Sequence, residues 1–159
     1  MPAYYTVTPG ATQTTNAVAG TENDCFFIKP GATRSLFLTA LYFAGKGAAL
    51  TSISGIIYRL KQWTTTSSSG GTALTPAVKG PFLAATATAG YGAATVTSGT
   101  GGPTLKGAWG SGSTSPSPWI SKNIDEAYEV DAAANNSLDI FNSSLAVSLN
   151  FEMSADIAE

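Results

Sequence analysis

The sequence predicts an all-β protein: a single antiparallel β-sandwich, jelly roll or barrel of about 8–10 strands with long Gly/Ser/Thr loops. Short apolar segments with period-two alternation recur along the chain, and pairs of Gly, Pro and Asn residues separate them. No helical pattern of about 10–15 residues lies between these segments, which argues against a parallel α/β sheet. Charged residues make up only 11% of the 159 residues, and Thr, Ser, Gly and Ala are abundant instead. This composition is typical of β-sandwiches and barrels.

The clearest strand is near the C-terminus, where large apolar residues alternate with small or polar ones over residues 145–153. A strict period of two places all the large groups on one face, so we expect a strand with one buried face. Residues 34–43 are apolar on both faces, as in a strand with the core on one side and a partner on the other. Residues 50–63 form a third long strand, in which Gly55 marks a bulge.

Shorter segments complete the predicted sheets. The remaining strand candidates are residues 4–8, 24–29, 82–88, 93–97, 118–122, 128–130 and 138–141. The best helix candidate, residues 123–133, is short enough to be a single turn or an acidic loop. Residues 64–71 and 107–118 consist mainly of Gly, Ser, Thr and Pro, and we expect both to be long exposed loops.

The chain has the size of one domain, residues 1–159, with residues 1–20 as a candidate extended N-terminal arm. The start of the sequence lacks the charged and apolar regions of a signal peptide, and no stretch reaches the roughly 18 apolar residues of a membrane span. We therefore expect synthesis in a cytoplasm and no membrane partner. Cys25 is the single cysteine, so the fold contains no internal disulfide.

The charges are distributed unevenly. All eight Lys and Arg residues lie at or before Lys122, where Glu22 and Asp24 are the acids, giving a formal charge of +6. The eight other acids follow and bring the net charge to −2. Interleaved strands could cancel this difference, or complementary faces could steer subunits into head-to-tail contact. The basic residues are dispersed singly, so we expect no nucleic-acid partner.

No catalytic constellation is visible, and we expect a protein that is not an enzyme. The chain has no histidine, which removes imidazole bases and most zinc sites. Gly99 to Gly102 lack the following Lys-Ser/Thr of a phosphate-binding loop. An acidic segment offers hard oxygen ligands for Ca²⁺ or a pair of glycosidase carboxylates, but an acidic surface is the preferred interpretation. Its acids are Asp125, Glu126, Glu129 and Asp131.

Several residues are candidates for contact with a partner. Tryptophans at strand ends or in loops either cap the core or insert into a neighbour, and Trp109 stands alone among Gly and Ser. The two-faced apolar strand and the acidic segment are the other candidate surfaces. The complete set of interface candidates is Trp109, Trp119, Leu36, Phe37, Leu38, Asp125, Glu126 and Glu129.

Residues 56–153 resemble small structural proteins of tailed bacteriophages. The resemblance is carried by a strand ending in Trp63, a Thr/Ser run, and residues 70–76 (Gly-Gly-Thr-Ala-Leu-Thr-Pro). An Ala/Thr-rich stretch, residues 133–140 (Ala-Ala-Asn-Asn-Ser-Leu-Asp-Ile) and a closing Phe-Glu pair follow. Head decoration (cement) proteins are the best match in size.

This resemblance implies a β-barrel or jelly-roll-like domain, often trimeric, that holds neighbouring capsid proteins together on the virion exterior. We therefore expect the major capsid protein or another virion protein as the partner, a homotrimer, and synthesis in the cytoplasm of a bacterial host. The alternatives are a neck, tail or fibre-associated virion protein and a carbohydrate-binding β-sandwich module.

Overall fold

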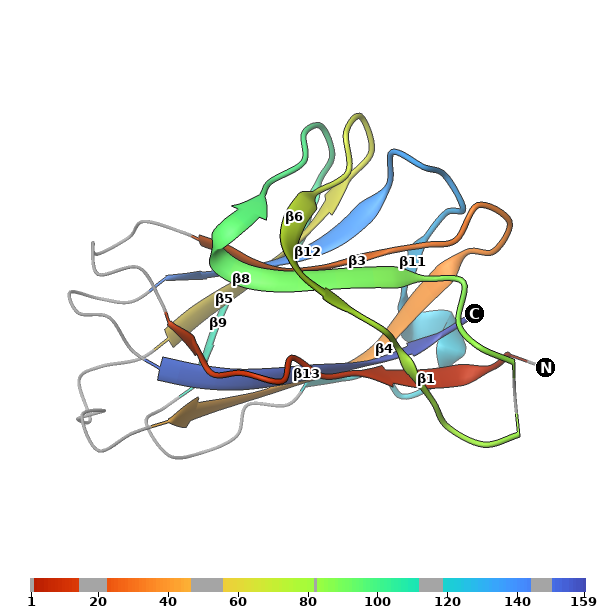
Figure 1. The fold of residues 1–159 in the computed structure, drawn as a ribbon, viewed down its shortest axis with the longest axis horizontal. Helices are drawn as coiled ribbons and strands as arrows, with labels where there is room; N and C mark the ends of the chain where they lie inside the picture. The colour runs from red at the N-terminus through yellow and green to blue at the C-terminus, as the bar shows by residue number, and fades with distance from the viewer. Residues whose placement is uncertain (1, 15–22, 47–55, 82, 112–118, 144–149) are drawn as a thin grey trace.

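A computed structural model describes residues 2–14, 23–46, 56–81, 83–111, 119–143 and 150–159. The chain is all-β, as predicted, and forms two antiparallel sheets packed face to face (Figure 1). Sheet A has the order β10 (Trp119–Ile120), β4 (Leu36–Lys46), β13 (Asn150–Ala158), β1 (Tyr4–Val7) and β7 (Ala77–Val78). Sheet B has the order β6 (Ser69–Leu74), β8 (Thr88–Thr97), β3 (Asn23–Lys29), β12 (Ser137–Ser143), β5 (Ile56–Trp63) and β9 (Thr104–Ser111).

Two further short strands extend sheet A and break its flanks into segments. β11 (Tyr128–Val130) pairs with β4 in line with β10, and β2 (Gln13–Thr14) pairs with β13 in line with β1. The link between β10 and β11 contains the 3₁₀ helix η1 (Ile124–Glu126), capped by the side chain of Asn123. The central pair β4–β13 is therefore flanked on both sides by interrupted strands.

The core lies between the sheets and is built from alternate residues of both. The rings of Phe43 from sheet A and Tyr58 from sheet B stack with centroids 3.7 Å apart, and Phe151 meets Tyr58 edge-on at 5.9 Å. In β13 the alternation predicted from the sequence holds: Phe151, Met153, Ala155 and Ile157 are buried. Residues 145–149 of the predicted strand lie outside the described residues.

The described strands differ from the prediction in three places. Residues 83–87, predicted as a strand, form no ladder, because the main-chain N–H groups of Thr86 and Ala87 donate to the carboxylate of Glu159. Conversely, part of each predicted glycine-rich loop is a strand: 69–71 begin β6 and 107–111 end β9. The described part of the proposed N-terminal arm is not free either, since β1 and β2 both pair with β13.

A β-bulge in β3 decides which side chains reach the outer face of sheet B. Phe26 pairs with Ile140 and Asp24 with Phe141, so Cys25 is the extra residue between them. The bulge turns Cys25 into the core and places Asp24 on the outer face, although strict alternation would put Asp24 on the same side as Phe26. Among the described residues, no helix is long and apolar enough to cross a membrane.

Candidate functional site

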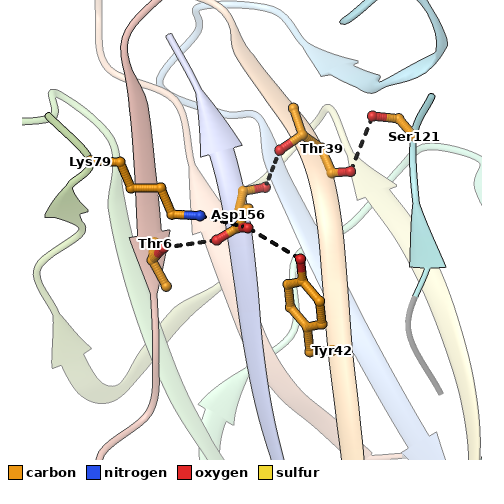
Figure 2. A network of polar contacts seen from close by, with 6 residues as sticks. All are labelled: Thr6, Thr39, Tyr42, Lys79, Ser121 and Asp156. Carbon is orange, nitrogen blue, oxygen red and sulfur yellow. Dashed lines mark hydrogen bonds and ion pairs between the residues drawn. The ribbon is translucent and has the colours of Figure 1, made fainter. Parts of the chain in front are cut away.

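The outer face of sheet A carries a polar network centred on Asp156 of β13 (Figure 2). Its carboxylate accepts a hydrogen bond from the Thr6 hydroxyl at 2.8 Å and a longer one from the Tyr42 hydroxyl at 3.4 Å. The ammonium group of Lys79 lies 2.7 Å from the same carboxylate, which therefore has a cationic partner at the surface.

The network extends across the sheet through main-chain atoms. The Thr39 hydroxyl donates to the carbonyl of Asp156 at 3.1 Å, and the Ser121 hydroxyl donates to the carbonyl of Thr39 at 3.1 Å (Figure 2). Three strands and two loop residues are thus joined over one face of the sheet. This arrangement ties the Tyr42 hydroxyl to Asp156.

A pocket of about 440 Å³ adjoins Tyr42 on this face. Residues 42–44 of β4 and 152–154 of β13 line it, and residues 8–12, which connect β1 to β2, form its wall. The pocket exists because β1 ends its pairing with β13 at Ala155 and β2 resumes it at Phe151. Residues 152–154 therefore have no strand partner on this side.

The interruption leaves a peptide unit of β13 facing the pocket. Ala3 and Glu159 exchange both main-chain hydrogen bonds, and in an antiparallel ladder every second residue of a strand points its N–H and C=O to the same side. Every second residue back from Glu159 therefore points its N–H and C=O toward β1, and this series includes Met153. Met153 thus directs its N–H and C=O toward residues 8–12, which connect β1 to β2. Within the described residues, no main-chain hydrogen bond joins Met153 to that connection.

Exposed apolar side chains also gather on the side of sheet A. Tyr4, Tyr42 and Ile120 project from its outer face, with Ile120 59% exposed. Val78 lies on the edge strand β7, and Leu83, 77% exposed, follows it in the next loop. These five are the exposed large apolar residues among the side chains that the structure describes, and none of them belongs to the described side chains of sheet B.

The structure separates the interface candidates predicted from the sequence. Leu36 and Leu38 are fully buried in the core, so the prediction that they meet a partner is wrong; their side chains pack against sheet B instead. Phe37 points to the outer face and is half-buried. Trp119 faces inward and packs against the core and against Tyr128, with ring centroids 4.9 Å apart.

The predicted exposed loop around Trp109 is in part a strand. Trp109 belongs to β9, an edge strand of sheet B, where it is paired with Tyr58 of β5. Residues 112–118 of the predicted loop lie outside the described residues.

The acidic candidates lie together at one edge of sheet A but do not form a metal site. Asp125 and Glu126 lie on η1, and Glu129 is on β11; all three are exposed. Asp131 follows β11 and is exposed as well. In the described part of the chain, no three acids, cysteines or histidines are grouped so that they could hold a metal ion. The four acids are therefore an acidic edge and not a calcium site.

The outer face of sheet B contains a buried pair of acids that the sequence did not indicate. Asp24 of β3 and Asp139 of β12 lie diagonally across the ladder, 5% and 0% exposed. Ser68 donates from its hydroxyl toward both carboxyl groups, and the Ser137 hydroxyl donates to Asp139 at 2.6 Å. The N–H of Gly99 in turn donates to the Ser68 hydroxyl at 2.7 Å.

Two loops cover this pair. Residues 64–68, between β5 and β6, lie beside residues 98–102, between β8 and β9, and main-chain hydrogen bonds join Thr65 and Thr66 to Thr100 (Figure 1). Trp63 packs edge-on against Phe141 beneath them, with centroids 6.0 Å apart. The loops thus exclude water from a second, smaller buried cluster outside the main core.

Burial raises the pKa of both carboxyl groups. Desolvation, followed by the charge of Asp139 close by, raises the pKa of Asp24 from 3.8 to about 9. Desolvation also raises the pKa of Asp139, although hydrogen bonds from Asp24, Ser137 and Ser68 favour its charged form. We assign the proton to Asp24, which donates to Asp139. Burial likewise raises the pKa of the Cys25 thiol well above its usual value, so this cysteine is an unreactive core residue.

Sequence reasoning missed the pocket and the acid pair for different reasons. The pocket depends on an interruption between β1 and β2 that only their pairing with β13 reveals; Pro9 and Gly10 were the visible signal of a turn there. The acid pair depends on the bulge at Cys25 and on the fold of two loops. The chain matches no protein-family model, no curated protein and no solved structure.

Proposed function

We propose that this protein is a virion structural protein that decorates and stabilises an icosahedral capsid by binding between neighbouring shell subunits. The observation that carries this proposal is that four of the five large apolar side chains described as exposed lie on sheet A, and the fifth, Leu83, follows its edge strand β7. Apolar and aromatic side chains exposed among polar groups on one face favour a protein–protein contact. Among the side chains of sheet B that the structure describes, no large apolar one is exposed.

The charges support a surface with a defined partner. Glu129, Glu152 and Asp156 lie on the outer face of sheet A, whereas Lys29, Arg59 and Lys61 lie on that of sheet B. Lys29 and Lys61 place their ammonium groups over Phe27 and Phe141, at 5.3 and 4.2 Å from the ring centroids. A face that is acidic and partly apolar favours a partner with a basic rim, and it disfavours contact with the same face of a second copy of the chain.

The same separation of charge suits assembly from several copies. A head-to-tail contact between subunits closes into a ring when the rotation permits, and a trimer places three copies of the docking face over one site. Weak contacts at each face then add up to strong binding through multivalency. The protein would act through this binding and would need no chemistry of its own.

Virion composition tests the proposal directly. Purified particles should contain the protein in copy numbers that match capsid sites, and a co-sedimentation assay should show it bound to emptied shells. Ile120→Ser and Leu83→Ser should weaken this binding, while Thr72→Ala, at an exposed position on edge strand β6 of sheet B, should leave it unchanged. A copy number of only a few per particle would overturn decoration and favour a neck, tail or fibre role.

A further inference from the structure

The pocket beside Tyr42 has the chemistry of a ligand site that the proposed function does not use. Its volume of about 440 Å³ falls within the range of small-molecule sites. It lies on an exposed sheet face and its floor is the backbone of two paired strands, β4 and β13, which gives it a rigid base.

The lining disfavours anionic ligands. Residues 8–12, 42–44 and 152–154 include no Lys or Arg, so no positively charged side chain lines the pocket to hold an anion. Glu152 is the single acid in the lining; its carboxylate accepts a hydrogen bond from the Thr12 hydroxyl at 3.4 Å and has further acceptor sites for ligand hydroxyls. Lys79, on the same face, is held by Asp156 at 2.7 Å and is not part of the lining.

What remains is a combination of hydroxyl groups, main-chain groups and one aromatic ring. Thr8, Thr12 and Ser154 contribute hydroxyls, and Met153 turns an N–H and a C=O toward the wall of the pocket, where no main-chain hydrogen bond to another described residue holds them. The Tyr42 ring is 36% exposed, and its hydroxyl is directed away to Asp156, so the ring and not the hydroxyl is offered to the pocket (Figure 2).

We propose that this pocket binds a saccharide residue. A neutral sugar ring has hydroxyls that both donate and accept hydrogen bonds, as the serine, threonine and main-chain groups here require. It also has an apolar C–H face that packs on an aromatic ring. The Asp156 network fixes the orientation of Tyr42 before the ligand arrives, which lowers the entropy cost of binding. The inference stands independently of the proposed docking on a capsid.

An NMR titration of the ¹⁵N-labelled full chain tests it. The probes are methyl α-mannoside, methyl β-galactoside, methyl β-glucoside and N-acetylglucosamine, with L-arginine methyl ester and inorganic phosphate as charged comparators. At least one sugar should shift the amide signals of Met153 and Gly10, and neither charged probe should do so. Preferential binding of a charged probe, or no shift with any sugar, would overturn the proposal.

Variants locate the site. Tyr42→Ala should weaken sugar binding about tenfold, and Ala44→Phe, which fills the floor of the pocket, should abolish it. Tyr42→Phe should retain binding, because it keeps the ring. Tyr4→Ala is the matched control: Tyr4 lies on the same face with 38% exposure but outside the pocket. If Tyr4→Ala weakens binding as much as Tyr42→Ala in variants that melt cooperatively, the pocket is not the site.

Discussion

The two outer faces of the sandwich treat their acids in opposite ways. On sheet A, Asp156 stays near solvent, with Lys79 at 2.7 Å and two hydroxyl donors around it. On sheet B, Asp24 and Asp139 lie beneath two loops, and desolvation, followed by the charge of Asp139, raises the pKa of Asp24 to about 9. The residue type is the same on both faces, so burial beneath the covering loops, and not residue type, makes Asp24 the proton donor of its pair.

The outer faces of sheets A and B also differ in what they contribute to the molecule. The covered face of sheet B adds a second buried cluster and stabilises the fold. Among the described side chains, the open face of sheet A carries the exposed large apolar groups, and it adjoins the pocket. Four predictions test this division, beginning with the largest expected effect.

Gly99→Ala should separate the two loops, residues 64–68 and 98–102, that lie over the outer face of sheet B. A Cβ atom at this position would overlap the carbonyl oxygen of Thr66 and lie 2.7 Å from the Trp63 ring, so the loops must separate. We expect the free energy of unfolding in urea to fall by about 3 kcal/mol. Gly10→Ala is the control on the sheet A side, because a Cβ there meets nothing within 4 Å, and it should change stability by less than about 0.5 kcal/mol. Equal losses of unfolding free energy in the two variants would mean that the packing of these two loops does not stabilise the fold.

Asp24→Asn should remove a pH dependence that sheet B imposes. The folded protein keeps a proton on Asp24 up to about pH 9, whereas the unfolded chain releases it near its ordinary pKa of 3.8. The free energy of unfolding should therefore decrease as the pH rises from about 4 toward 9, by at most about 1.4 kcal/mol per pH unit, because in this window the unfolded chain releases a proton that the folded protein keeps.

Urea unfolding of the wild type and the variant at several pH values measures this slope. The chain has no histidine, so few other side chains titrate in that window. Asp24→Asn keeps a donor for Asp139 without a titrating proton and should flatten the slope. If the free energy of unfolding changed with pH identically in the two proteins, the ionised carboxylate would be that of Asp24, against our assignment.

Asp156→Asn should have a smaller effect, because sheet A is open. The substitution removes the ion pair with Lys79 but leaves hydrogen-bonding partners in Thr6 and Tyr42. We expect a loss of about 1 kcal/mol in thermal unfolding, and less at high salt, where surface ion pairs are screened. A loss that does not depend on salt would show that the pair behaves as a buried one.

Ile120→Ser should hardly change the free energy of unfolding. Ile120 is 59% exposed on the outer face of sheet A, so the change should stay within about 0.5 kcal/mol. Ile140→Ser, on a side chain that is fully buried in sheet B, should instead cost about 3 kcal/mol or more. Calorimetric melting of both variants measures the difference, and a marked loss with Ile120→Ser would mean that sheet A is covered in solution.

The sequence predicted the fold class and most strands because alternation and turn residues are local signals. Residues 24–29 and 128–130 match β3 and β11 closely, since each segment is short and its buried face is apolar. The strand expected at 82–88 failed because its N–H groups bond to Glu159, more than 70 residues away, and no local pattern reveals that partner.

The candidate site was harder to predict, because it depends on pairing and not on residue type. Residues 34–43 were expected to meet a partner on one side, but β10 and β11 cover one edge of β4 while sheet B covers Leu36 and Leu38. Asp24 and Asp139 are far apart in the chain and become neighbours only through the bulge at Cys25. Nothing in the sequence marks that extra residue.

The central strand of each sheet comes later in the sequence than the strands with which it pairs. β13 lies between β4 and β1, and β12 lies between β3 and β5, so the earlier strands of both sheets wait for residues 137–158. On the ribosome, the nascent chain therefore exposes unpaired strand edges until residues 137–158 have emerged, and neither sheet can close earlier. Such long-range topology folds slowly and favours a chaperone at the exit tunnel, so production of this protein should be limited by folding after translation and not by the stability of the finished sandwich.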